Sequence, residues 1–272
     1  AIAMYEQALT VSQAHHNEDG TARILYNLGF VFELQGDRER ALDYFQKASD
    51  IFQKLYGDSS PFYAVALNKV ASSYATLFDH QAALAAYEKS MAINLAKFGP
   101  EHPKIAISKL NISIVLASMG RLAEAIRLNR ESVEILEKNF PYPHPQKAET
   151  YGYLTQRYYE LGTKPDSTAY FSEKCLAESR LLYGDRHEMI AAALVDKSIY
   201  LNARGHRQEA LATIQEALIA STQTFDSRDI NQNPTPDDFF QTQRNISIIQ
   251  PKALILAHIW EDSHRTEDIE LA

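Results

Sequence analysis

This 272-residue sequence has little or none of three features, and each shortage excludes a class of protein. It has one cysteine, Cys175, which excludes an intrachain disulfide and a cysteine-based zinc cluster. No run of about 18 apolar residues occurs, so a membrane-spanning helix is not expected. The formal net charge of -8 disfavours a broad nucleic-acid-binding surface, which needs a basic stripe.

Two patterns are also missing. No strand-length stretch alternates apolar and polar residues with period two, and no glycine-rich phosphate loop appears. The chain begins at Ala1 with no basic-then-apolar signal segment, so we expect a fragment or a processed product. A cytoplasmic location is expected, with any targeting information outside this segment.

The stretch from Leu25 to Ala48 contains a helical pattern of apolar residues. Its apolar and small residues follow the helical i, i+3, i+4, i+7 spacing, and a Gly36-Asp37 turn interrupts that spacing once. Two short amphipathic helices joined by a tight turn are predicted.

The same pattern returns down the chain. Ala41, Ala83, Ala125 and Ser167 follow one another at intervals of 42 residues, and Ala210 comes 43 residues later. A large apolar site, a small-residue site and a turn glycine recur with it. The small-residue site, where two helix backbones are expected to approach closely, is occupied in turn by Gly29, Ala71, Ser113, Thr155 and Ser198. The turn glycines are Gly36, Gly120, Gly162 and Gly205, with Phe78 as the exception. The chain is therefore predicted to be an all-α repeat protein.

The repeats set the expected organisation. Residues 1–224 are predicted to form stacked helical hairpins, residues 225–245 an irregular linker, and residues 246–272 a further helix of a truncated repeat with a polar end. A half-unit occupies residues 1–14, and the full units span about 21–55, 63–98, 104–140, 146–183 and 188–224. Gly or Pro ends each second helix.

This pattern resembles the tetratricopeptide repeat (TPR), whose signature matches Leu25, Leu28-Gly29, Phe32, Ala41, Phe45 and Ala48. The 42-residue spacing is similar to that of the longer-helix units of kinesin light chains and of many bacterial regulatory proteins. The resemblance implies a right-handed α-solenoid that binds protein or peptide partners.

A second resemblance concerns the segment after Ala220. Ala217-Leu218, Phe225-Asp226, Asn233-Pro234 and Lys252-Ala253-Leu254 resemble a linker in the TPR regions of bacterial CHAT-domain proteins, which are caspase-like proteases. It implies that a protease domain follows these repeats in a longer chain.

The residues that invite a chemical role have structural explanations. Cys175 lies on a second helix where a small packing residue is expected. His102, His144 and His187 share one linker position in successive units, where helix capping and linker packing are expected. Neighbouring repeats lie about 10 Å apart, too far for shared metal coordination. No catalytic constellation, cofactor or metal site is predicted, and the chain is not expected to be an enzyme.

The expected working surface is the concave face lined by the first helices. Asn side chains there both donate and accept hydrogen bonds, as an extended peptide backbone requires, and the aromatic residues supply apolar anchors. Lys69 is expected to stand nearly alone among neutral residues, which argues against a clamp for a terminal carboxylate. The predicted partner-binding residues are Tyr26, Asn27, Phe30, Glu33, Asn68, Lys69, Ser72, Asn111, Ile114, Tyr153, Gln156 and Tyr159.

The leading hypothesis is a non-catalytic interaction or scaffold region that binds a protein or peptide in the concave groove. It would be the sensing part of a larger CHAT-type protease or regulator. The alternative is a free-standing adaptor that binds cargo peptides, similar to kinesin light chain. Neither nucleic acid nor membrane is an expected partner, and the ends of the solenoid offer a route to self-association.

Overall fold

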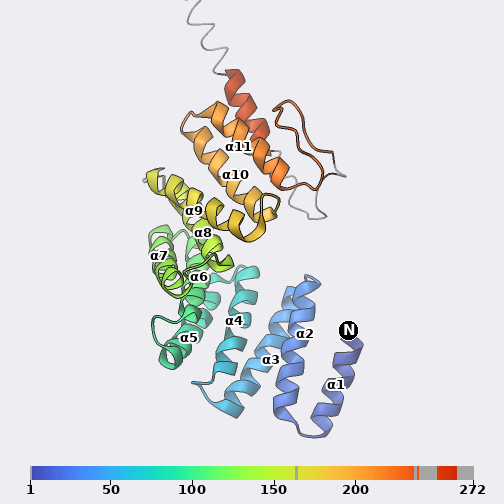
Figure 1. Ribbon diagram of the computed structural model, residues 1–272. Helices are drawn as coiled ribbons and strands as arrows, with labels where there is room; N and C mark the ends of the chain where they lie inside the picture. The colour runs from blue at the N-terminus through green and yellow to red at the C-terminus, as the bar shows by residue number, and fades with distance from the viewer. Residues whose placement is uncertain (1, 163–164, 236–237, 239–249, 262–272) are drawn as a thin grey trace, which may run out of the picture. The chain divides into compact units, whose positions relative to one another are not determined.

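A computed structural model describes residues 2–162, 165–235, 238 and 250–261 (Figure 1). These residues are mostly helical and hold no β-strand. The helices are α1 (Ile2–Ala14), α2 (Glu18–Leu34), α3 (Arg38–Tyr56), α4 (Pro61–Thr76), α5 (His80–Phe98), α6 (Pro103–Ser118), α7 (Leu122–Asn139), α8 (Pro145–Leu161), α9 (Pro165–Tyr183), α10 (Glu188–Ala203) and α11 (Arg207–Ala220). Residues 250–261 form a further helix.

Consecutive helices pack as antiparallel hairpins, and the all-α solenoid fold predicted from the repeats is confirmed. The chain divides into two compact units, residues 1–139 with α1 to α7 and residues 140–272 with the remaining helices. Much of the predicted linker over 225–245 and of the predicted end over 246–272 lies outside the described residues.

Side-chain caps fix where the helices begin. The carboxylates of Asp37 and Asp79 accept the backbone N–H three residues on, at the starts of α3 and α5. Asn17 caps α2 in the same way. Proline occupies the first turn of α4, α6 and α8, where its missing N–H has no intrahelical partner to lose.

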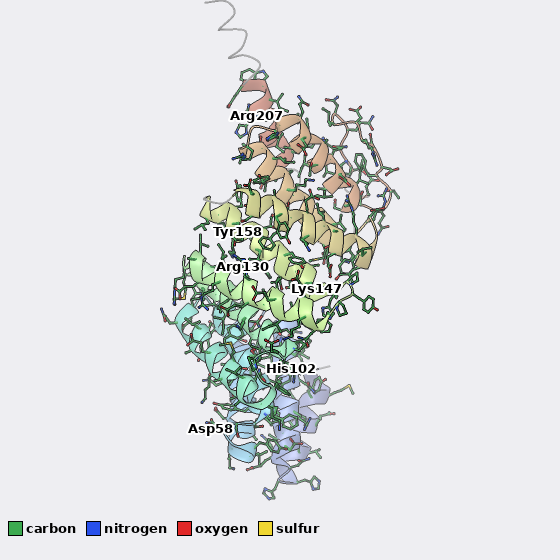
Figure 2. The ribbon with its side chains drawn as sticks, turned by 60° about the vertical axis from the view of Figure 1, so that its left-hand side comes forward. Asp58, His102, Arg130, Lys147, Tyr158 and Arg207 are labelled. Carbon is green, nitrogen blue, oxygen red and sulfur yellow. The ribbon has the colours of Figure 1, made fainter. Side chains whose placement is uncertain are left out.

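The three aligned histidines are helix caps. Nδ1 of His102, His144 and His187 accepts the N–H of the second residue on, at 3.1, 3.3 and 3.1 Å respectively. Each imidazole also stacks on the aromatic ring four residues before it, with ring centroids 3.9 to 4.7 Å apart. His102 can be found in Figure 2. The prediction of capping and linker packing is confirmed.

The turn inside each hairpin needs a left-handed residue. Gly36, Gly120, Gly162 and Gly205 have φ between 69° and 81°. Phe78 takes the same place with φ of 65° and a ring that is 77% exposed. The turn therefore keeps its left-handed backbone where the glycine is missing, although a residue with a Cβ is strained in this conformation.

The small-residue site faces a side chain rather than a backbone. A Cβ built on Gly29 would lie 2.7 to 3.0 Å from three ring atoms of Phe45, which is fully buried. The atoms nearest to the missing Cβ of Gly29 are therefore those of a side chain. The aromatic residue of α3 fills the space that glycine leaves, so the two repeat positions are coupled in size.

A hydrogen bond between the helices of a hairpin recurs in both units. The hydroxyl of Ser90 donates to the carbonyl of Ala64 at 2.8 Å, and that of Ser132 donates to Ala106 at 2.9 Å. In the second unit, Cys175 Sγ donates to the carbonyl of Ala148 at 3.3 Å. Cys175 therefore stands where earlier repeats have serine.

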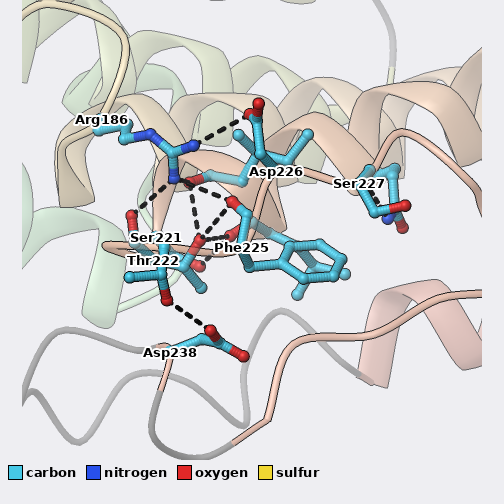
Figure 3. A network of polar contacts seen from close by, with 11 residues as sticks. Arg186, Ser221, Thr222, Phe225, Asp226, Ser227 and Asp238 are labelled. Atoms are coloured by element: carbon cyan, nitrogen blue, oxygen red, sulfur yellow. Dashed lines mark hydrogen bonds and ion pairs between the residues drawn. The ribbon is translucent and has the colours of Figure 1, made fainter.

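An irregular loop, residues 221–235, follows α11 and is held by long polar side chains. The Arg186 guanidinium donates to the carbonyls of Ile219, Thr222 and Phe225 at 2.9 to 3.1 Å and pairs with Asp226 (Figure 3). This cation joins a carbonyl in the last turn of α11, that of Ile219, to two carbonyls of the loop that follows.

Gln215 and Lys252 hold the rest of the loop. Gln215 Nε2 donates to the carbonyls of Ser227, Asp229 and Gln232. Lys252 belongs to the helix over 250–261, and its side chain is buried. Its Nζ donates to Gln215 Oε1 at 2.7 Å, to Asn233 Oδ1 at 2.7 Å and to the Gln232 carbonyl at 3.0 Å. Loop and final helix are thereby joined through one ammonium group.

Candidate functional site

In the first unit, the predicted residues of α2 form a partly exposed polar and aromatic strip. Tyr26 is half-buried and packs edge-on against Phe45, with ring centroids 5.4 Å apart. Asn27 is exposed, and Phe30 has 43% of its surface exposed. Burial raises the pKa of the Tyr26 hydroxyl, with Glu33 adding to the effect.

Lys69 joins α4 to this strip. Its Nζ lies 2.7 Å from Glu33 Oε2, and both side chains are about 30% exposed (27% and 32%). The ammonium also lies 4.9 Å from the centroid of the Phe30 ring and 5.7 Å from that of Phe45, within cation–π range. The expectation that Lys69 stands nearly alone among neutral residues is wrong, because a carboxylate 36 residues away compensates its charge.

The remaining predicted residues of this unit are half-buried. The Ser72 hydroxyl hydrogen-bonds to Tyr87, whose pKa burial raises. The side-chain oxygen of Asn68 is buried with no hydrogen-bond partner among the described residues. Asn111 and Ile114 lie on α6 at intermediate exposure. Phe30, Glu33 and Lys69 therefore lie together, and among the described side-chain contacts neither Asn111 nor Ile114 joins them.

In the second unit, the predicted residues lie along α8. Tyr153 is half-buried and hydrogen-bonds to Glu149, a carboxyl whose pKa is raised by burial. Gln156 is exposed, and Tyr159 has 42% of its surface exposed. Tyr159 also lines a cavity of about 320 Å³.

This cavity brings together residues that the sequence analysis did not select. Its apolar walls are Ile199 and Ala203 of α10 and Leu254 and Ile255 of the final helix. A polar edge is formed by Asn202, whose amide lies 3.0 Å from His258 Nδ1, and by Arg207, which donates to the His258 carbonyl (Arg207 is labelled in Figure 2). No local motif indicates it, because its walls are some 50 residues apart in the chain.

Asp196, one turn before Ile199 on α10, was missed as well. Among the described residues its carboxylate has no hydrogen-bond or ion-pair partner, whereas its neighbour Glu160 is held by both oxygens on Arg157. Burial, together with the charge of Glu160, raises the pKa of Asp196 to about 6. The only local signal is one acidic residue directly after the apolar run from Met189 to Val195.

Cys175 has the properties of a packing residue. The thiol is 3% exposed, and burial raises its pKa to about 11, so it is not a thiolate near neutral pH. The described residues contain no group of three or more His, Cys, Asp or Glu side chains that could hold a metal ion. None of the described helices has the length and apolar character that crossing a membrane demands.

These features define an all-helical protein of stacked hairpins with a partly exposed first-helix surface. A family model of the tetratricopeptide repeat matches residues 1–54, 20–96 and 62–138. The chain belongs to the tetratricopeptide-repeat family, whose fold is typical of protein-interaction scaffolds and is generally non-catalytic.

Solved structures with the same fold include a protein with TPR-like repeats and a phosphatase. A Podosopora anserina protein with nearly identical TPR-like repeats, assigned as a kinesin light chain, is 20% identical, with a TM-score of 0.64 over 75% of this chain and 97% of that chain. BtubC (BKLC) from P. vanneervenii is 18% identical, with a TM-score of 0.69 over 86% and 93%. Aspartyl phosphate phosphatase F from Bacillus subtilis is 16% identical, with a TM-score of 0.64 over 80% and 59%. At these identities the likeness shows the fold alone.

Proposed function

We propose that this chain is a non-catalytic interaction region that binds a peptide or protein partner along the concave face lined by its first helices. The observation that carries the proposal is the cluster of Phe30, Glu33 and Lys69. An exposed ring lies beside an ion pair that links two neighbouring hairpins, so an apolar anchor is held in a fixed place. Fixed aromatic anchors are the residues that dominate binding energy at protein interfaces.

The charge balance of the cluster favours an extended peptide segment over a terminal carboxylate. A carboxylate clamp needs uncompensated cations, and Lys69 is already paired with Glu33. The exposed amide of Asn27 in the first unit can both donate to and accept from a peptide backbone, whatever its sequence, and Gln156 offers the same groups within the second unit.

Capture of the partner by the immobilised chain, followed by mass spectrometry, tests this function. The double variant Asn27→Ala/Phe30→Ala removes an amide and the ring but keeps both members of the ion pair, and we expect capture to fall about tenfold or more. The matched control is Gln46→Ala/Tyr142→Ala, because both side chains are exposed and belong to α3 and a loop. Equal capture by both variants would place the binding site elsewhere.

We propose further that the chain is the sensing part of a larger CHAT-type protease or regulator. Support comes from the linker resemblance, whose matched pieces have defined places in the loop. Arg186 binds the Phe225 carbonyl and the Asp226 side chain, and Lys252 binds Asn233. The alternative, a free-standing adaptor that binds cargo peptides, is supported by the fold shared with the kinesin-light-chain-like structures. Reading the gene beyond Ala272 distinguishes them: a following His/Cys α/β domain supports the first and contradicts the second.

A further inference from the structure

The cavity of the second unit differs from the rest of the predicted surface because it has depth. Its volume of about 320 Å³ is at the lower end of the range of about 300–1,000 Å³ that is usual for ligand pockets. That size suits one large side chain rather than a whole cofactor. Two of its walls, Tyr159 and Leu254, are 42% and 54% exposed, so apolar surface there still faces solvent.

The residues at the polar edge of the cavity each make at least one hydrogen bond. Asn202 and His258 hydrogen-bond to each other, and Arg207 donates to a backbone carbonyl. A ligand group that enters the cavity gains contact with the apolar walls formed by Ile199, Leu254 and Ile255. An aromatic or large aliphatic side chain makes these contacts.

Asp196 adds a charge requirement next to the cavity. It lies on the face of α10 that carries Ile199 and Ala203, at i, i+3 and i+7. Among the described residues it has no cation, and the nearby Glu160 repels it. A carboxylate held in this way is stabilised by any cation that a partner brings to it.

The helix geometry sets the distance between Asp196 and the apolar wall of the cavity. With a rise of 1.5 Å per residue, Asp196 lies about 7 Å along α10 from the middle of the wall formed by residues 199–203. In an extended peptide, side chains two residues apart lie on one face and are separated by about 7 Å. A basic and an apolar residue with one residue between them match this spacing.

We propose that the cavity between α10 and the helix over 250–261 receives an aromatic or large aliphatic side chain of an extended peptide, while Asp196 pairs with a Lys or Arg two residues away in the same peptide. This inference rests on the proposed peptide-binding function and deepens it, because it assigns a sequence preference to one subsite. Both orders of the two side chains along the peptide satisfy this spacing.

Fluorescence polarisation with the full chain tests the preference. The probes are the fluorescein-labelled peptides Gly-Ser-Lys-Ser-Phe-Ser-Gly and Gly-Ser-Phe-Ser-Lys-Ser-Gly, each compared with a version that has Glu in place of Lys. We expect the Lys form of at least one probe to bind about tenfold more tightly than its Glu form. With Asp196→Asn, the ratio should fall below about threefold, and the matched control Glu209→Gln, at an exposed position of α11, should leave it unchanged.

A second variant tests the cavity itself. Ala203→Phe places a ring at the exposed edge of the cavity, and binding of both Lys probes should fall about tenfold. Ala212→Phe, at an exposed position of α11, should leave binding unchanged. Methyl NMR should show shifts at Ile199, Ile255 and Leu254 when the probe is added.

Three results would overturn the inference. They are no binding of either Lys probe at about 1 mM, an equal preference in wild type and Asp196→Asn, and equal binding by Ala203→Phe and Ala212→Phe. None of them touches partner capture through Asn27 and Phe30. The inference and the proposed function can therefore fail separately.

Discussion

Replacing Gly29 by alanine should destabilise the first unit, although alanine is the better helix former. In a helix interior, alanine is favoured over glycine by about 1 kcal/mol. Against that gain stands the contact of the new methyl group with Phe45, at 2.7, 2.8 and 3.0 Å from ring atoms. The ring is fully buried, packs against Tyr26 and lies below the Lys69 ammonium, so it has no free direction in which to move.

Overpacking of this kind costs about 1–3 kcal/mol, so after the gain of about 1 kcal/mol we expect a net loss of about 0–2 kcal/mol for Gly29→Ala. The chain offers a matched control in Gly152, which also lies inside a helix. A Cβ there meets only Cys175 Sγ at 3.7 Å, an ordinary contact. Gly152→Ala should therefore raise stability by about 1 kcal/mol.

Urea unfolding followed by far-UV circular dichroism measures both changes, and amide hydrogen exchange in α2 and α8 locates them. A double-mutant cycle isolates the contact. In a Phe45→Leu background the clash is relieved, so Gly29→Ala should become neutral or stabilising, with a coupling energy of about 2 kcal/mol. The reasoning is refuted if Gly29→Ala stabilises α2 as much as Gly152→Ala stabilises α8.

Four further outcomes are expected. Cys175→Ser should keep the hydrogen bond to the Ala148 carbonyl and change the free energy of unfolding by less than about 1 kcal/mol. Cys175→Val has no donor and should lose more stability. A larger loss for serine than for valine would contradict the idea that Cys175 takes the place of the serine in other repeats. The raised pKa of Asp196 means that the folded state takes up a proton as pH falls through about 6, before the unfolded state does so near 3.8. Asp196→Asn should therefore be more stable than wild type by up to about 2–3 kcal/mol at pH 7, and this difference should vanish by about pH 4; a pH-independent difference argues against the burial of this carboxylate. Lys252→Met leaves the buried Gln215 Oε1 without its donor, so amide exchange over residues 225–235 should accelerate at a local cost of about 1–3 kcal/mol; unchanged exchange rules out the ammonium as the group that holds the loop. Phe78→Gly should raise the unfolding free energy by about 1 kcal/mol because it removes a left-handed residue with a Cβ, and thermal unfolding that shows a decrease contradicts the strain.

The sequence by itself determined the repeating parts of this protein. Spacing of 42 residues, turn glycines and linker histidines are local signals, since a helix, its cap and its turn are formed by residues within about five positions of one another. The histidine caps could be predicted in this way. The packing role of Cys175 could also be predicted. Its hydrogen bond to the partner helix, which is equivalent to those of Ser90 and Ser132, could not be predicted.

Only the tertiary structure decided which side chains of different repeats meet. Glu33 reaches Lys69, Gln215 reaches Lys252, and Ile199 and Ile255 share one cavity, in each case across 36 or more residues. Asp196 looks like any surface acid in the sequence, and its lack of a cation appears only when its surroundings are known. Periodicity fixes the face on which a residue lies, but the angle and offset between packed helices fix its neighbours, and these depend on side-chain volumes summed over the whole interface.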